Sequence, residues 1–481
     1  MEQTQLVELL KSLTTDESTN FSQFARLNQF NHSRYHQQVI LLLETCLNHL
    51  KCNKTADLTK ETVYSNVFPG QKFVDGKLDK VMVEAQKVLR TFLIVGRYLR
   101  EENHFQHQLD LAEEFRNRRL QNRYEQTALR LQKSLEDSPE SYEGFYQKYQ
   151  FEYIKYDLET IHNTGKGDLN IPNAIYALES FYYNYKLLLL NQYQLQQKVA
   201  HLNVPERLKQ LIDDHFIPSI YLDGSRLLFA QKEIFELLKK SAPTPAEVSH
   251  FFQLLQENQH NFSEKCLSDF YAFLRNLCVL AGSANHENME ITVLLHEIHK
   301  DNLERGFMHS GGKISRSKYM AIANNALYIG KFDWAYEFIE KYKNELHEEN
   351  ESRDVYRLNL ANYLFRIGKF EECLDNIPDS SPSMIYTLFG KRLELKSLYE
   401  LQSDLLSYKL DAFKMFLSRT SKKIMSDAQR NAHIDFANLL YQLEHSTPGA
   451  PRRSDVLTKR IQEKKQSAEY HWLLQKARAL K

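Results

Sequence analysis

Apolar residues return every three or four positions along most of this chain, with polar residues filling the intervals. Near the beginning, Leu6, Leu9, Leu10 and Leu13 keep that spacing, which puts them on one face of a helix. Only 15 glycines and 11 prolines are present, so long helices are favoured over β-structure. The pattern predicts helical stretches at 5–51, 78–135 with a break near 101–104, 138–156, 172–189, 208–216, 227–238, 248–255, 263–280, 289–303, 319–377, 384–401, 405–417, 426–443 and 456–480.

One part of this pattern occurs twice, between residues 319 and 377. The run Ile329-Gly330-Lys331-Phe332 returns as Ile367-Gly368-Lys369-Phe370, an offset of 38 residues (367 − 329). Ala323, Asn324 and Ile339 find the same residue types at that offset, in Ala361, Asn362 and Ile377. A repeat of this length is the signature of stacked supersecondary units.

Each copy predicts a helix, a turn at glycine and a second helix. Gly330 and Gly368 stand where the first helix has to end in a left-handed residue, a conformation that is cheap for glycine. The small side chains of Ala323 and Ala361 allow the paired helices to approach closely.

These residues resemble the tetratricopeptide repeat, over about 60 residues. The period is longer than the family's roughly 34 residues, and the second copy has Cys where Ala is usual. The matching positions are Ala323, Ala326, Gly330, Phe332 and Ala335 in the first copy, and Ala361, Leu364, Gly368, Phe370 and Cys373 in the second.

The resemblance implies a groove, lined by the first helix of each pair, that binds an extended peptide or a partner helix. Asn324 and Asn362 are the best expected contacts, because a paired asparagine ladder clamps a peptide backbone or a carboxylate. Family members that clamp a terminal carboxylate have Lys where this chain has Met320. The groove positions are Met320, Asn324, Leu327 and Tyr328 in the first copy, and Leu358, Asn362, Phe365 and Arg366 in the second.

The expected fold is therefore all-α, with antiparallel helix pairs stacked into an α-solenoid. Residues 313–445 are the tetratricopeptide-like part, and residues 1–305 either continue the solenoid or form a separate helical bundle. Residues 446–481 are expected to be a linker, around Thr447 to Pro451, followed by a basic helix.

Composition limits the classes of function that are expected for the chain. Lys and Arg together number 62, as do Asp and Glu, so the chain as a whole has no electrostatic attraction to polyphosphate or anionic lipid. Five cysteines without a C-x-x-C motif predict neither a disulfide framework nor a zinc module, and they favour the cytoplasm. No apolar run reaches 18 residues, so no membrane span is expected.

Clusters of basic residues suggest an alternative to peptide binding, in which the protein associates with nucleic acid. Arg116, Arg119, Arg123 and Arg130 would form a stripe along one helix, although the interleaved acids Glu113, Glu114 and Glu125 favour an ordinary solvated face. From Arg452 onward there are nine basic residues, Arg460, Lys464 and Lys465 among them, and three acidic ones. Such a helix either binds an anionic partner or caps the solenoid with a polar face.

The motifs that would predict chemistry are incomplete. Gly311-Gly312-Lys313 falls short of a phosphate-binding loop, because Phe307 replaces its first Gly and Ile314 its Ser or Thr; the segment is expected to be a loop between helices. His296 and His299 are three residues apart and so lack metalloprotease spacing, and Glu101, His104 and His107 have no second Glu-x-x-His helix. We therefore expect a scaffold for protein interactions with no catalytic role, no cofactor and no metal.

Overall fold

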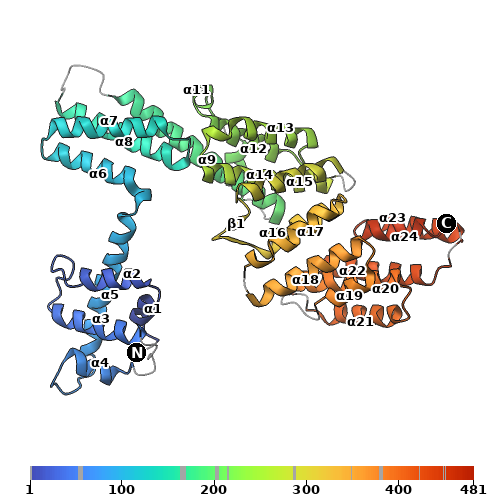
Figure 1. Ribbon diagram of the computed structural model, residues 1–481. Coiled ribbons are helices and arrows are strands. Elements are labelled where there is room, and N and C mark those ends of the chain that lie inside the picture. Colours follow the sequence, from blue (N-terminus) through green and yellow to red (C-terminus); the bar gives the residue numbers. More distant parts are fainter. Residues whose placement is uncertain are drawn as a thin grey trace. The chain divides into compact units, whose positions relative to one another are not determined.

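The computed structural model describes residues 3–51, 58–162, 170–200, 205–213, 216–284, 289–347, 349–378, 383–421, 423–447, 449 and 451–481. Helices α1 to α24 make up nearly all of its regular structure, so the all-α prediction is confirmed (Figure 1). The chain divides into two compact units, one formed by Met1–Ser138 and Glu143–Phe181 and the other by Pro139–Tyr142 and Tyr182–Lys481. The expected boundaries near 305 and 446 both fall inside the second unit.

The first unit contains two separate hydrophobic cores. Helices α1 to α5 enclose one around Leu6, Phe21 and Leu42, and α6 to α8 enclose the other around Leu109 and Phe151. Its elements are α1 (Gln5–Lys11), α2 (Thr15–Phe24), α3 (His36–Lys51), α4 (Lys60–Val67), α5 (Lys77–Tyr98), the 3-10 turn Glu101–Asn103, α6 (His104–Asn117), α7 (Gln121–Asp137), α8 (Tyr142–His162) and the first part of α9 (Ile171–Ala200).

The long helical stretch predicted at 78–135 is interrupted twice. The expected break near Glu101 is present, as the 3-10 turn between α5 and α6. A second break follows at Arg119, whose φ of 58° ends the helical path, and α6 and α7 pack on each other. The arginine stripe expected along a single helix is therefore wrong: Arg116 belongs to α6, Arg119 to the turn and Arg123 to α7.

In the second unit, each helix from α12 onward packs on the next one in sequence. Its elements are the rest of α9, α10 (Glu206–Asp213), α11 (Ser219–Asp223), α12 (Arg226–Lys239), α13 (Pro245–Asn258), the 3-10 turn Gln259–Asn261, α14 (Glu264–Ala284), α15 (Met289–Glu304), β1 (His309–Ser310), β2 (Lys313–Ile314), α16 (Arg316–Tyr328), α17 (Phe332–Lys341), the 3-10 turn Lys343–Glu345, α18 (Glu349–Arg366), α19 (Phe370–Asn376), α20 (Met384–Glu400), α21 (Leu405–Arg419), α22 (Asp427–Glu444), α23 (Pro451–Glu463) and α24 (Tyr470–Arg478).

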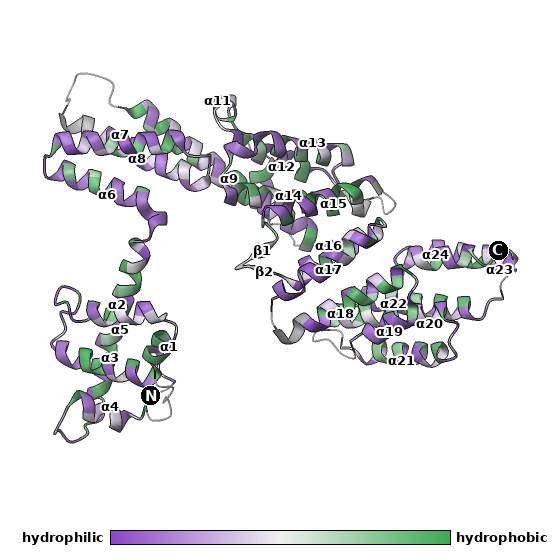
Figure 2. Cartoon of the chain, viewed as in Figure 1, coloured by the Kyte–Doolittle hydropathy of each residue, from purple (hydrophilic) through white to green (hydrophobic). Residues whose placement is uncertain are grey.

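Several helices begin where the sequence supplies a capping box. Thr244 Oγ1 accepts from the amide of Glu247, whose carboxylate accepts from the amide of Thr244, and Ser426 and Gln429 do the same for α22. Hydrophobic and hydrophilic residues alternate along the helices, as the hydropathy colouring shows (Figure 2). Tyr363 packs against three of the buried clusters of the second unit and so joins them.

Two predicted segments fold differently. The loop expected at Gly311-Gly312 is the turn of a β-hairpin that pairs Ser310 with Lys313, with φ of 58° and 73° at the two glycines. The single helix expected over 456–480 is wrong, because the chain turns at Glu469 and forms the helical hairpin α23–α24. Of the expected linker, Pro448 and Ala450 lie outside the described residues, and the Gly449 amide donates to the Leu480 carbonyl at 3.0 Å.

Candidate functional site

The two copies of the repeat have the same turn geometry. Gly330 and Gly368 have φ of 77° and 82°, and the amide after each glycine donates to the carbonyl five positions earlier, at 2.9 Å in both copies. Neither glycine has a neighbouring atom within 4 Å of the place where a Cβ would stand. Backbone conformation, and not crowding, is thus what requires glycine here.

The two asparagines of the predicted groove lie in contact. Asn362 Nδ2 in α18 donates to Asn324 Oδ1 in α16 at 2.7 Å, so the pair joins the first helices of the two copies. Within the described residues, this leaves Asn324 Nδ2 as a donor and Asn362 Oδ1 as an acceptor without a protein partner. Asn324 is half-buried and Asn362 is 5% exposed. An amide donor beside a carbonyl acceptor matches the two hydrogen-bonding groups of a peptide unit.

The remaining groove positions divide between core and surface. Tyr328 is 42% exposed and Arg366 is also exposed, so these two flank the asparagine pair at the surface. Arg366 forms no hydrogen bond or ion pair in the part of the chain that the structure describes. The other four are buried core residues: Met320, Leu327, Leu358 and Phe365.

Beside this surface, α20 and the turn before α24 hold a buried charge network that the sequence did not reveal. Lys396 Nζ and Arg392 Nε donate to the two oxygens of Glu469, at 2.7 and 2.9 Å. Burial would raise the pKa of Glu469, but the two cations outweigh that effect and bring it to about 2. Burial lowers the pKa of Lys396, whose ammonium lies 4.7 Å from the ring centroid of Phe365.

The network continues one turn along α20. Glu400 accepts from Trp472 Nε1 at 3.1 Å and from Lys476 Nζ at 2.6 Å. Arg392, Lys396 and Glu400 are spaced by four residues, so a charged stripe on α20 was visible in the sequence. Nothing local indicated that the stripe would be buried against the C-terminal hairpin.

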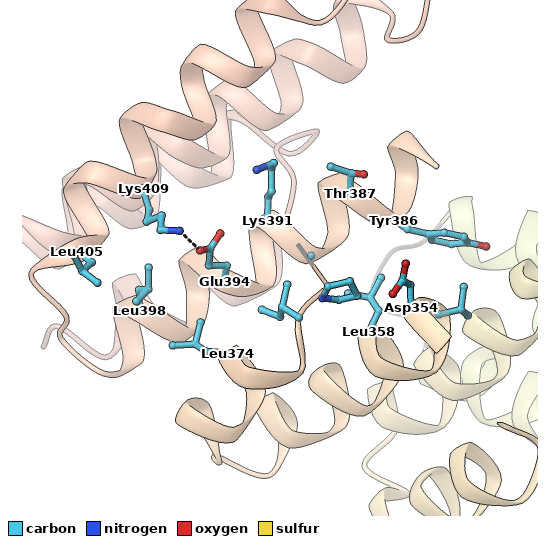
Figure 3. A pocket seen from close by; sticks show the side chains of 14 residues that line it. Asp354, Leu358, Leu374, Tyr386, Thr387, Lys391, Glu394, Leu398, Leu405 and Lys409 are labelled. Carbon is cyan, nitrogen blue, oxygen red and sulfur yellow. Dashed lines mark ion pairs between the residues drawn. The ribbon is translucent and has the colours of Figure 1, made fainter. Parts of the chain in front are cut away.

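A cleft opens between α18, α19, α20 and α21 (Figure 3). It has a volume of about 350 Å³ and an apolar floor that includes Leu358, Leu374 and Leu398. Four charged residues stand around it, and two of them, Lys409 and Glu394, are paired at 2.6 Å. The other two, Asp354 and Lys391, have no ion-pair partner among the described residues. Leu358 is the one predicted groove residue that lines this cleft.

Gly390 lines the cleft where α20 lies against α18 and the end of α19. A Cβ at this position would stand 3.4 Å from Ile377 Cγ2 and 3.5 Å from Leu358 Cδ1. Both distances are ordinary van der Waals contacts, so a small side chain would fit here without a shift of either helix.

The alternative basic surface is dispersed. Arg460 donates to Gln442 Oε1 at 2.7 Å and Lys464 pairs with Asp435, while Lys465 is exposed. Arg116, Arg119 and Arg123 belong to the first unit, and Arg123 donates to Gln126 Oε1 at 3.4 Å. The structure brings each of these two groups to the surface of its own unit but does not show them as one site.

The structure places the histidines of the two motifs in different surroundings. His296 and His299 are buried, and His296 packs edge-on against Trp334 with the ring centroids 4.6 Å apart. Burial lowers the pKa of His299 to about 3. His107 Nε2 donates to the Tyr98 carbonyl. Within the described ranges, no three His, Cys, Asp or Glu side chains gather as metal ligands would.

None of the helices in the described segments combines the length and apolarity that crossing a membrane requires. Comparison of the chain with family models, curated proteins and solved structures gives no match, so a proposal for its function depends on the local geometry alone.

Proposed function

We propose that this protein is a non-catalytic scaffold of stacked helix pairs that binds an extended peptide or partner helix along α16, α18 and α20. The single observation that carries the proposal is the hydrogen bond between Asn324 and Asn362. It aligns two side-chain amides from successive helix pairs and leaves one donor and one acceptor free. A peptide backbone offers the complementary acceptor and donor.

The residues around the asparagine pair would suit a peptide that has both apolar and acidic side chains. Tyr328 supplies exposed aromatic surface and Arg366 supplies an unpaired positive charge. Within the network, the Glu469 carboxylate is shared by two cations, Arg392 and Lys396. We therefore expect the preferred peptide to carry an acidic residue near the backbone segment that the asparagines bind.

The cleft between α18 and α21 would take an apolar side chain of the partner. Its volume of about 350 Å³ lies at the lower end of the range for ligand pockets, roughly 300–1,000 Å³. Asp354 and Lys391 at its margin would pair with charges on either side of that anchor.

The proposal includes a cytoplasmic location, which the state of the cysteine thiols supports. Cys46, Cys278 and Cys373 are free, buried thiols, Cys266 is also buried, and Cys52 lies outside the described residues. Burial raises the pKa of the Cys46 thiol to about 12, so it stays protonated and unreactive.

Nucleic-acid binding remains the alternative prediction, but two of its predicted contacts, Arg460 and Lys464, already bind Gln442 and Asp435.

The test begins with selection of binders to the purified full chain from a library of random extended peptides. Affinity of an enriched peptide is then measured for the wild type and for the double variant Asn324→Ala with Asn362→Ala. Loss of two hydrogen bonds is expected to weaken binding by about 10- to 100-fold, at roughly 1 kcal/mol per bond.

Asn344→Ala is the matched control, because this exposed asparagine lies in the 3-10 turn after α17. It should leave both the peptide affinity and the thermal midpoint unchanged. If no peptide is enriched, or if the double variant binds as tightly as the wild type, the groove is not the binding site.

A further inference from the structure

A second cleft, the α15–α17 cleft, is lined by residues of those two helices and has a volume of about 330 Å³. Two of its lining residues, Leu303 and Phe338, are buried. Trp334 and Tyr342 are half-buried, so part of each ring is open to the cleft. No residue of this cleft belongs to the asparagine groove or to the cleft beside α20, so the proposed function does not account for it.

Three aromatic rings follow one face of α17 along this cleft. Trp334, Phe338 and Tyr342 are spaced by four residues. The first two rings are stacked, with an interplanar angle of 7° and centroids 5.6 Å apart, and the third follows at 5.2 Å. In the second copy of the repeat, 38 residues later, Glu372 and Asn376 stand at the positions of Trp334 and Phe338. The repeat itself therefore does not require aromatic residues here.

The lysines that line the cleft are engaged, whereas its carboxylates are not. Lys300 Nζ pairs with Glu297 at 3.3 Å, and Lys341 Nζ lies 5.0 Å from the centroid of the tyrosine ring that follows it. The carboxylates of Glu304 and Glu337 have no hydrogen-bond or ion-pair partner in the part of the chain that the structure describes. The charges available to a ligand in this cleft are therefore negative.

We propose that the α15–α17 cleft binds an alkylammonium group over the Trp334 ring. The face of an indole attracts a cation, and no cation lies over Trp334 among the described residues. Glu337 follows Trp334 by three residues, which places its carboxylate on the same side of α17, and Glu304 adds a second carboxylate from α15. The volume, at the lower end of roughly 300–1,000 Å³ for ligand pockets, suits one side chain or a small quaternary amine.

The ammonium group belongs either to a free small molecule or to a lysine side chain of another protein. Both present the same cation to the indole ring and the carboxylates, so they are distinguished by experiment. The proposed peptide groove and this cleft share no residue, and each proposal therefore stands or fails by its own test.

The test uses the fluorescence of the full chain, which has only two tryptophans, Trp334 and Trp472. The chain is titrated with choline chloride, with its neutral isostere 3,3-dimethylbutan-1-ol and with N-acetyl-lysine methylamide, each at constant ionic strength. Choline should give a saturable change and bind about tenfold or more tightly than the isostere, because only choline has a charge. Tighter binding of the lysine derivative than of choline would identify a protein side chain as the ligand, and equal or weaker binding a small amine.

Four variants locate the site. The response to choline should persist in Trp472→Phe and vanish in Trp334→Phe, which removes the reporter from the cleft. Glu337→Gln should weaken choline binding by about two- to fivefold, since it removes one exposed charge. Glu371→Gln is the matched control, because Glu371 is an exposed carboxylate on α19, outside the cleft and without a partner among the described residues.

The control variant should bind choline as the wild type does. Equal affinity for choline and the isostere would reduce the cleft to a merely apolar surface and overturn the proposal. Absence of a saturable response in the wild type, or wild-type affinity in Glu337→Gln, would overturn it as well.

Discussion

Replacing Glu469 by Gln tests the buried network that fastens the C-terminal hairpin to α20. The substitution keeps the size and the backbone preference of the residue, which has a left-handed φ of 57°, and it removes only the negative charge. Lys396, with a side chain 5% exposed, and Arg392, 17% exposed, then lose their shared counter-ion.

The expected loss of stability follows from the pKa of Glu469, which is about 2, whereas the ordinary value for this side chain is 4.5. Each tenfold change in acidity corresponds to about 1.4 kcal/mol, so the folded protein favours the carboxylate by about 3 kcal/mol. Breaking a buried ion pair by removing one partner costs about 3–5 kcal/mol, in agreement with that figure. Because the folded pKa lies below the unfolded one, this stability is complete above pH 4.5 and is lost as the pH falls through 2.

Hydrogen exchange measured by mass spectrometry reports the hairpin directly. A loss of about 3 kcal/mol should make the amides of α24 exchange roughly 100-fold faster in the variant at pH 7. Adding Lys396→Met to Glu469→Gln should recover part of the protection, because it removes one of the two stranded charges.

Glu463→Gln is the control, since Glu463 is exposed at the end of α23 in the same hairpin. It should change exchange by less than about threefold, as surface substitutions usually do. If Glu469→Gln accelerates exchange no more than this control, the network does not hold the hairpin in place.

Two further predictions concern pH and glycine. Burial lowers the pKa of His433 to about 4 and that of His299 to about 3, so between pH 6.5 and these values the unfolded chain binds protons that the folded chain does not. In urea unfolding, the free energy of unfolding should therefore fall by about 2 kcal/mol for each histidine as the pH drops from about 6.5 to 5. A His433→Gln variant whose free energy of unfolding fell as steeply with pH as that of the wild type would contradict this. Gly330→Ala and Gly368→Ala should each lose about 1–2 kcal/mol in the same assay, because both positions have positive φ. Gly96→Ala in α5 should instead gain up to about 1 kcal/mol, and equal losses at all three positions would refute the conformational argument.

Local periodicity and turn chemistry predicted most of the secondary structure. The break near Glu101 and the left-handed glycines of the repeat were visible because a helix end is decided within a few residues. The hairpin at Gly311-Gly312 was missed, since its strands have two residues each and form no periodic pattern. The helix predicted to begin at residue 138 begins only at Tyr142, and the Glu140 amide before it donates to the distant Asn261 carbonyl at 2.7 Å.

Charge content by itself misrepresented the C-terminal segment. Nine basic residues against three acidic ones, counted from Arg452 onward, predicted a single basic helix that either binds an anionic partner or caps the solenoid with a polar face. Glu469, one of the three acids, instead turns the chain and neutralises two cations of α20, 77 and 73 residues earlier. Such a pairing leaves no trace in a local window of sequence.

The sequence by itself determined that this protein is helical, where its repeated turns lie and which two asparagines occupy equivalent positions, because spacing along one helix sets which side chains share a face. Only the tertiary structure decided that those asparagines bond to each other, that five of the eight predicted groove residues are buried, Asn362 among them, and that Glu469 meets Arg392 and Lys396. Contacts between helices depend on how distant segments pack, and helical periodicity does not encode that choice.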